Sequence, residues 1–150
     1  MKHFKLTTES KVNAFGITLF RVELIINCKW GSSGDKGGWV EKEENISGNA
    51  WVSGNAEVHG NARVYGNAEV YGNAWVSGDA WEKSPLQIQG TFHFLNVYKK
   101  GFLKIGCKEF SLEFWKENFE KIGKENGYTD EQIIEYGLYI DLAIKLSEQK

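Results

Sequence analysis

The chain has few side chains of the kinds that commonly do chemistry, and the most suggestive pair is His59 and Arg63. They lie four residues apart in a stretch made otherwise of small, aliphatic, aromatic and acidic residues. A histidine can take a proton from a hydroxyl or amine, and an arginine can hold an anionic group. His59 is therefore the candidate base if the protein is an enzyme; otherwise it is a surface or interface histidine.

The remaining candidate ligands and nucleophiles are isolated in the sequence. A zinc site shared between subunits would need three histidines brought together, whereas His3, His59 and His93 lie in unrelated contexts. We therefore expect no metal and no cofactor. Neither Cys28 nor Cys107 has a base among its sequence neighbours, so both are expected to be reduced, partly buried thiols.

A glycine-rich stretch runs from Gly31 to Gly38 and is flanked by Trp30 and Trp39. It lacks the Gly-Lys-Ser/Thr ending of a phosphate-binding loop, so it is predicted to be a turn that leads into the next element. Lys36, with Lys29 and the two tryptophans, could still form an anion site with aromatic stacking.

A hexapeptide repeat dominates the centre of the chain. Between Ile46 and Trp81 the sequence reads ISGNAW, VSGNAE, VHGNAR, VYGNAE, VYGNAW, VSGDAW, without insertion. Each unit has one aliphatic residue, one alanine and a Gly-Asn or Gly-Asp pair, which takes the positive φ of a tight corner. The period predicts a solenoid over residues 40–84 with three sides per coil and 18 residues per coil, entered from Val40.

Adding 18 predicts which outward side chains share a side of the coil. One side carries Ser47, Trp51, Tyr65 and Glu69; the second carries Ser53, Glu57, Tyr71 and Trp75; the third carries His59, Arg63, Ser77 and Trp81. Two coils are few for a repeat protein, so the flanking segments are expected to cap the ends and oligomerisation to cover the aromatic sides.

The flanks predict the remaining architecture. Residues 1–39 are expected to form an N-terminal β element, with strands near 3–7 and 19–26 and a turn near Phe15. Residues 85–150 are expected to form strands followed by a helical hairpin. Ser111 is the predicted cap of the first helix, and Thr129 with Gln132 forms a capping box for a second helix that ends near Ser147.

Composition limits the classes of partner. The chain has 150 residues, 18 basic and 20 acidic, so no footprint for a nucleic-acid polymer is expected. No apolar run approaches the roughly 20 residues of a membrane span, and no signal peptide is recognisable, so a cytoplasmic protein is expected. Aromatic residues make up 14% of the chain, which indicates contact surfaces as well as core.

The repeat resembles the left-handed parallel β-helix of hexapeptide-repeat proteins. The flanks add to the resemblance through motifs that occur in this order: Gly34-Asp35-Lys36-Gly37-Gly38-Trp39, Ile105-Gly106-Cys107, Trp115-Lys116-Glu117-Asn118 and Gly127-Tyr128-Thr129. Together they resemble a family of small hexapeptide-repeat proteins encoded by bacteriophages and prophages. That resemblance implies a homotrimer in a bacterial host and brings no assigned catalytic residues.

Three functions are compatible with these patterns. The first is a non-enzymatic trimer that sequesters a small, nucleotide-like ligand, such as a host immune signal, between subunits. The second is an acyl-CoA-dependent acyltransferase with His59 as base, and the third is a structural or protein-binding trimer. For the first, aromatic rings would stack on the ligand and basic groups would hold its phosphate. The candidate ligand-binding residues are Trp51, His59, Arg63, Tyr65, Tyr71, Trp75, Trp81 and Lys36.

Overall fold

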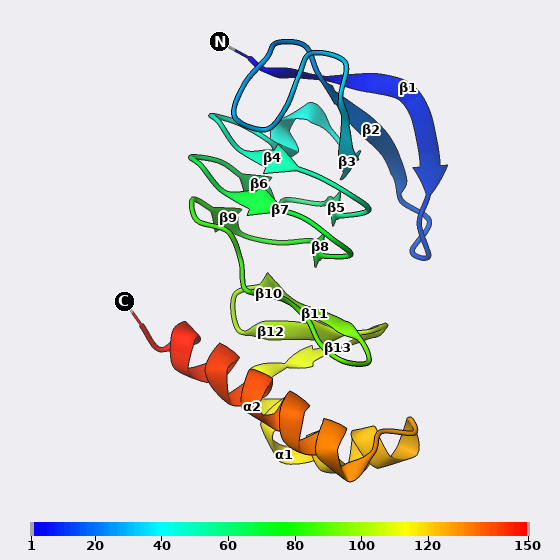
Figure 1. Ribbon diagram of the computed structural model, residues 1–150, viewed down its shortest axis with the longest axis vertical. Helices are drawn as coiled ribbons and strands as arrows, with labels where there is room; N and C mark the ends of the chain where they lie inside the picture. Colours follow the sequence, from blue (N-terminus) through cyan, green and yellow to red (C-terminus); the bar gives the residue numbers. More distant parts are fainter. Residues whose placement is uncertain (1, 150) are drawn as a thin grey trace. The chain divides into compact units, whose positions relative to one another are not determined.

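A computed structural model describes residues 2–149 and shows a mainly β protein with two helices near its C-terminus (Figure 1). The chain forms two compact units, residues 1–85 and 86–150. The N-terminal strands and the repeats belong to the first unit, and the remaining strands and both helices belong to the second.

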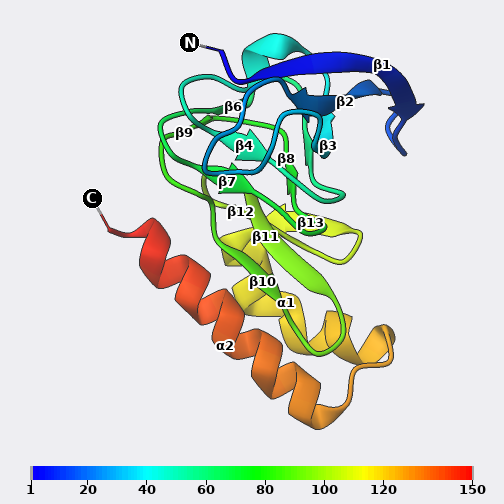
Figure 2. The ribbon, with the colours of Figure 1, turned by 45° about the horizontal axis from the view of Figure 1, so that its top comes forward.

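The repeats form a β-solenoid built from three parallel ladders, and residues 18 apart pair as the period predicts. Trp51 pairs with Glu69 on one ladder, and Glu57 pairs with Trp75 on another. Figure 2 shows the successive coils stacked on one another. The strands are β3 (Lys36–Val40), β4 (Trp51–Val52), β5 (Glu57–Val58), β6 (Arg63–Val64), β7 (Glu69–Val70), β8 (Trp75–Val76) and β9 (Ala80–Trp81).

Valine and alanine fill the interior of the solenoid. Their side chains are at most 1% exposed at Ala50, Val52, Ala56, Val58, Ala62, Val64, Ala68, Val70, Ala74 and Val76. The corner glycines take φ values between 60° and 64°. A Cβ on Gly48 would lie 3.1 Å from the backbone nitrogen of Gly66 in the next coil. Small corners are therefore required both by the backbone conformation and by the stacking of the coils.

The last corner departs from the predicted register. Arg63 pairs with Ala80 and Val64 with Trp81, which is a shift of one residue from the expected alignment of Arg63 with Trp81. Here Asp79 has the positive φ, 67°, in place of a glycine. Glu82 stands where the repeat would have its next valine. The shift puts Trp81 at the register position of the missing aliphatic residue and leaves Ala80 exposed, contrary to the prediction of an inward alanine.

An N-terminal hairpin continues one face of the solenoid. Strands β1 (Phe4–Val12) and β2 (Thr18–Leu24) pair antiparallel, and β2 pairs antiparallel with β3, giving the sheet order β1-β2-β3-β5-β8. The predicted entrance from Val40 is confirmed, because Val40 pairs with Val58. Residues 36–40 form a strand, although the glycine content of this stretch predicted a turn. A Cβ on Gly37 would collide with the carbonyl oxygen of Val52, so glycine here permits close packing on the coil.

Side chains bond the backbone groups that the solenoid leaves free at its ends. Each coil donates its N–H groups to the next coil, so the carbonyls of the first coil have no strand beyond them except on the side that β3 and β2 continue. The His3 ring bonds the Ala50 carbonyl through Nε2 at 2.7 Å, and Trp30 Nε1 donates to Asn49 O at 2.6 Å. At the other end the Glu69 N–H donates to Ser84 Oγ at 2.9 Å.

The third side is capped by the short 3₁₀ helix η1 (Glu43–Asn45). Asn45 is fully buried, and its Nδ2 donates to the carbonyls of Ala62 at 2.7 Å and Gly60 at 3.3 Å. Its Oδ1 accepts from Lys42 N at 2.9 Å. One amide side chain therefore replaces the hydrogen bonds of a missing strand.

The second unit is a four-stranded antiparallel sheet with two helices packed on it. The strands are β10 (Gln87–Gln89), β11 (Phe94–Lys99), β12 (Phe102–Ile105) and β13 (Lys108–Ser111), paired in that order. Helices α1 (Leu112–Glu125) and α2 (Asp130–Ser147) begin at the predicted caps: Ser111 Oγ accepts from Phe114 N, and Thr129 forms the capping box. The sequence did not predict β13, whose four residues are all half-buried.

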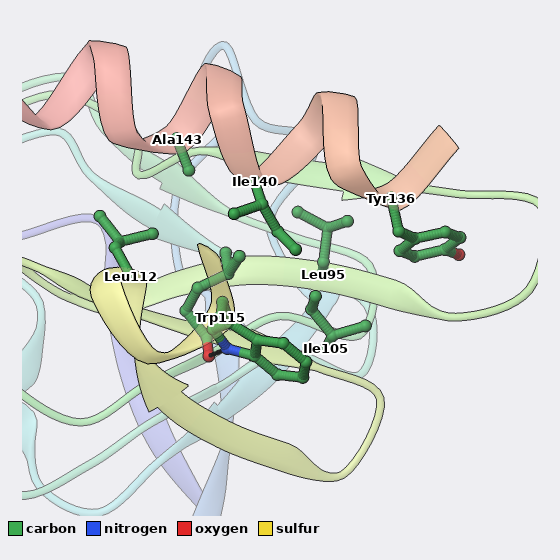
Figure 3. Close-up of a cluster of buried hydrophobic side chains, with 8 residues drawn as sticks. Leu95, Ile105, Leu112, Trp115, Tyr136, Ile140 and Ala143 are labelled. Atoms are coloured by element: carbon green, nitrogen blue, oxygen red, sulfur yellow. Dashed lines mark hydrogen bonds between the residues drawn. The ribbon is translucent and has the colours of Figure 1, made fainter. Parts of the chain in front are cut away.

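The core of this unit lies between the sheet and the helices. Figure 3 shows Tyr136, Ile140 and Ala143 of α2 pointing toward Leu95 of β11. Trp115 is 3% exposed, and its Nε1 donates to the carbonyl of Leu103 at 2.7 Å. Neither helix of the described chain is long and apolar enough to cross a membrane.

The capping role of Asn45 gives a first prediction. Asn45→Asp would set a carboxylate oxygen against two carbonyl oxygens inside the protein. We expect the free energy of unfolding at neutral pH to fall by about 3 kcal/mol. Asn55→Asp is the matched control, because Asn55 is an exposed corner residue and its change should stay within about 0.5 kcal/mol. Denaturant unfolding measures both variants, and equal effects would contradict the capping role.

Candidate functional site

Two of the three tryptophans predicted to line a ligand surface, Trp51 and Trp75, are covered by the N-terminal segment of the same chain. Trp51 is 4% exposed, and its ring lies 6.0 Å from that of His3. Trp75 is 8% exposed and stacks on Phe15 of the β1–β2 turn, with ring centroids 4.7 Å apart. A ligand reaches neither ring unless the N-terminal segment moves.

His59, the candidate base, is also buried. It is 4% exposed, and its ring centroid lies 4.6 Å from that of Trp75. Burial lowers the pKa of His59 below its ordinary value, and the nearby carboxylates of Glu57 and Glu41 offset only part of this. No described residue hydrogen-bonds its Nε2. The imidazole is therefore neutral near pH 7 and shielded from a substrate.

The third side of the solenoid keeps exposed groups. The Arg63 side chain is exposed, and its guanidinium lies 5.8 Å from the ring centroid of Tyr65. Trp81 is half-buried and donates through Nε1 to the carbonyl of Gly78 at 2.9 Å.

Tyr71 and Lys36 complete the set of predicted ligand-binding residues. Tyr71 is 41% exposed. The Lys36 ammonium pairs with Glu23, on the strand beside it, and lowers the pKa of that carboxyl. The eight candidate residues are spread over different sides of the solenoid. Among them, His59 contacts Trp75 and Arg63 contacts Tyr65.

A cavity of about 100 Å³ lies within the second unit. Its lining includes none of the eight candidate residues. Its walls come from the β12–β13 hairpin, from α1, from the α1–α2 turn and from α2. Most of the lining is apolar and includes Ile105, Trp115, Phe119, Ile133 and Ile140. Pockets of this composition bind apolar groups and use the few polar atoms at their edge for orientation.

His93 and Tyr128 form a polar corner of this cavity. His93 Nδ1 and the Tyr128 hydroxyl are 2.7 Å apart, which leaves Nε2 as the imidazole nitrogen available to a ligand. Phe92 stacks on both rings, with centroid distances of 4.2 Å to His93 and 4.8 Å to Tyr128. Burial, followed by the neighbouring Tyr136 and Glu135, raises the pKa of Tyr128 well above its usual range, so the phenol stays protonated.

Tyr136 holds the backbone of this corner in place. Its hydroxyl accepts from His93 N at 2.6 Å and from Phe92 N at 3.1 Å, and donates to His93 O at 2.6 Å. A Cβ on Gly90 would collide with the same hydroxyl, so only glycine fits there. The imidazole is therefore fixed from the α2 side as well as by Tyr128.

The cavity also joins residues that the sequence left isolated. Exposed Cys107 and half-buried Lys108 line it together with His93. A Cβ on Gly106 would lie 3.1 Å from the His93 ring, so the β12–β13 turn passes directly under the imidazole. No base lies near Cys107 in the sequence, because His93 and Cys107 belong to different strand connections. The only sign of this site in the sequence is glycine at positions 90 and 106. Glycine is required there by close packing against Tyr136 and His93, respectively.

Metal binding has no support in residues 2–149, where no group of three histidine, cysteine or carboxylate side chains is placed to hold an ion.

The solenoid geometry agrees with a family comparison. Residues 62–78 match the YdcK beta solenoid repeat. The chain is thus a β-solenoid repeat protein, with the match confined to part of the repeat region. No curated protein and no solved structure shows a significant match to it.

The burial of His59 predicts a pH dependence of stability. Its pKa is lower in the folded protein than the 6.5 of an exposed histidine, so below about pH 6.5 the unfolded chain binds a proton that the folded chain does not. The free energy of unfolding should therefore fall as the pH drops from 6.5, by up to about 1.4 kcal/mol per pH unit from this group. His59→Phe should flatten that slope in urea unfolding measured between neutral pH and pH 5, and unchanged slopes would contradict the assignment.

Proposed function

We propose that this protein is a non-enzymatic binding protein whose C-terminal unit takes up the ring of a small molecule. The observation that carries the proposal is the apolar cavity with one fixed polar corner, formed by His93 and Tyr128. Apolar walls favour transfer of a ring from water, and the imidazole selects a ring with a hydrogen-bonding group at one edge.

The size of the cavity limits the ligand. An apolar cavity of roughly 150 Å³ holds benzene, so the space of about 100 Å³ limits the buried part of a ligand to at most one six-membered ring. The rest of a larger ligand would extend past Cys107 and Lys108 into solvent. Lys108 would then meet an anionic group if the ligand carries one.

The acyltransferase alternative gains no support from the geometry. It requires a base that a substrate can reach, whereas His59 is 4% exposed and packed on Trp75. In the cavity, the Nδ1 of His93 contacts the protonated phenol of Tyr128. A carboxylate partner, by contrast, would strengthen an imidazole as a general base. Both observations favour binding.

We propose for the solenoid the role of a rigid scaffold with a left-handed coil, as in hexapeptide-repeat proteins. The six-residue period and the corner glycines with φ near 60° support that handedness. A homotrimer of phage type with a nucleotide-like ligand between subunits is the second candidate function. The exposed Arg63 beside Tyr65 favours it, because the pair offers a cation and a ring face to an anionic aromatic ligand.

Phenol and toluene test the cavity, because they have nearly the same shape and differ in one hydrogen-bonding group. We expect phenol to bind more tightly than toluene by about fivefold, the worth of one hydrogen bond of about 1 kcal/mol. His93→Phe keeps a stacked ring on Phe92 and should abolish this preference. Saturation-transfer NMR and the shift of the unfolding temperature measure binding of the two probes.

Ile122→Phe should block both probes, because the larger side chain fills the cavity that Ile122 lines. Ile134→Phe is the matched control: Ile134 is 66% exposed on the same pair of helices and lies outside the lining, so binding should be unchanged. Wild-type protein that binds neither probe, or binding that survives Ile122→Phe, would contradict the proposal.

A further inference from the structure

Helix α2 has two apolar faces, and within residues 2–149 only one of them is buried. Ile133, Tyr136, Ile140 and Ala143 are buried against the sheet and α1. On the opposite side Ile134 and Leu138 are each 66% exposed, Leu142 is 43% exposed and Leu146 is 41% exposed. A helix that is apolar all round is typical of helices buried on both sides.

The four exposed residues form a continuous ridge, because each follows the last by four positions. Residues at this spacing are neighbours on a helix surface. Such i, i+4 ridges pack against equivalent ridges on a second helix. We call the set Ile134, Leu138, Leu142 and Leu146 the α2 ridge. It runs over most of the length of the helix.

Charges beside the α2 ridge select one orientation of a partner helix. The first turn of α2 carries Asp130 and Glu131, and the last turn carries Lys145. Both Lys145 and its ion-pair partner Asp141 are mostly exposed, at 71% and 57%, so the lysine has room for further acidic neighbours. An antiparallel partner helix with an acidic first turn and a basic last turn would place opposite charges together at both ends of α2. Helix α2 itself has this charge pattern.

We infer that α2 pairs antiparallel with α2 of a second copy of this chain about a two-fold axis. The axis passes opposite the midpoint between Leu138 and Leu142, so each of these leucines contacts the other one in the partner. Lys145 then lies opposite position 135 of the partner, one helical turn from Glu131 in the partner's acidic first turn. An isologous contact of this kind is self-complementary. It is independent of the cavity, whose lining includes none of the α2 ridge.

The oligomeric state of the full chain tests the pairing. A single helix ridge covers less than the roughly 800 Å² per partner of a standard interface, so we expect a reversible dimer that dissociates on dilution. Leu138→Glu should raise the dimer Kd at least about tenfold, because it removes a buried leucine from the contact. Val12→Glu is the matched control: Val12 is 65% exposed, in the other unit, and should leave the Kd unchanged.

Disulfide trapping tests the direction of the helices. In a background of Cys28→Ser and Cys107→Ser, Leu138→Cys mixed with Leu142→Cys should cross-link rapidly between chains. Each variant alone should cross-link slowly, because identical positions lie about one helical turn, roughly 5 Å, apart along antiparallel helices. Circular dichroism establishes that every variant is folded.

Sedimentation of folded wild-type protein distinguishes the outcomes. A dimer that Leu138→Glu dissociates, together with cross-linking that needs both cysteine positions, supports the inference. A monomer at all concentrations, a trimer, or a dimer indifferent to Leu138→Glu overturns it. Fast cross-linking of Leu138→Cys with itself overturns the antiparallel arrangement.

Discussion

The constraint that shapes the first unit is the hydrogen bonding of the solenoid ends. A two-coil solenoid has as many end groups as a long one, and each buried carbonyl or N–H without a partner costs roughly 1–3 kcal/mol. The N-terminal hairpin, the 3₁₀ turn with Asn45, and the ring nitrogens of His3 and Trp30 bond these groups at one end. Because the caps fold over the coil, they also bury Trp51 and Trp75.

The repeat itself was predictable because its period determines which residues stack. The 18-residue register, the buried valines and alanines, and the positive φ of the corner glycines all follow from six units of sequence. Both helix caps were also predictable, since Ser111 and Thr129 act on residues three positions away. The prediction failed at the last coil, where Asp79 has the positive φ instead of Gly78 and the ladder is shifted by one residue.

The candidate cavity was not predictable, since its residues meet only through tertiary packing. His93 lies on one strand connection and Tyr128 in the turn between the helices, 35 residues later. The period of the repeat predicts which side chains point outward, and the sequence therefore favoured these residues as ligand-binding candidates. Whether an outward ring is exposed depends on what folds over it, and Phe15 on Trp75 has no sign in the sequence.

The three-ladder stacking also restricts how the length of such a protein can change. Insertion of 18 residues of repeat adds one complete coil and returns the chain to the same ladder, so both caps still meet the carbonyls and N–H groups that they bond. Insertion of six residues moves the exit of the chain to the next ladder, and Ser84 would no longer reach the amide of Glu69. Length variation among proteins built this way is therefore expected in whole coils, even though the sequence repeats every six residues.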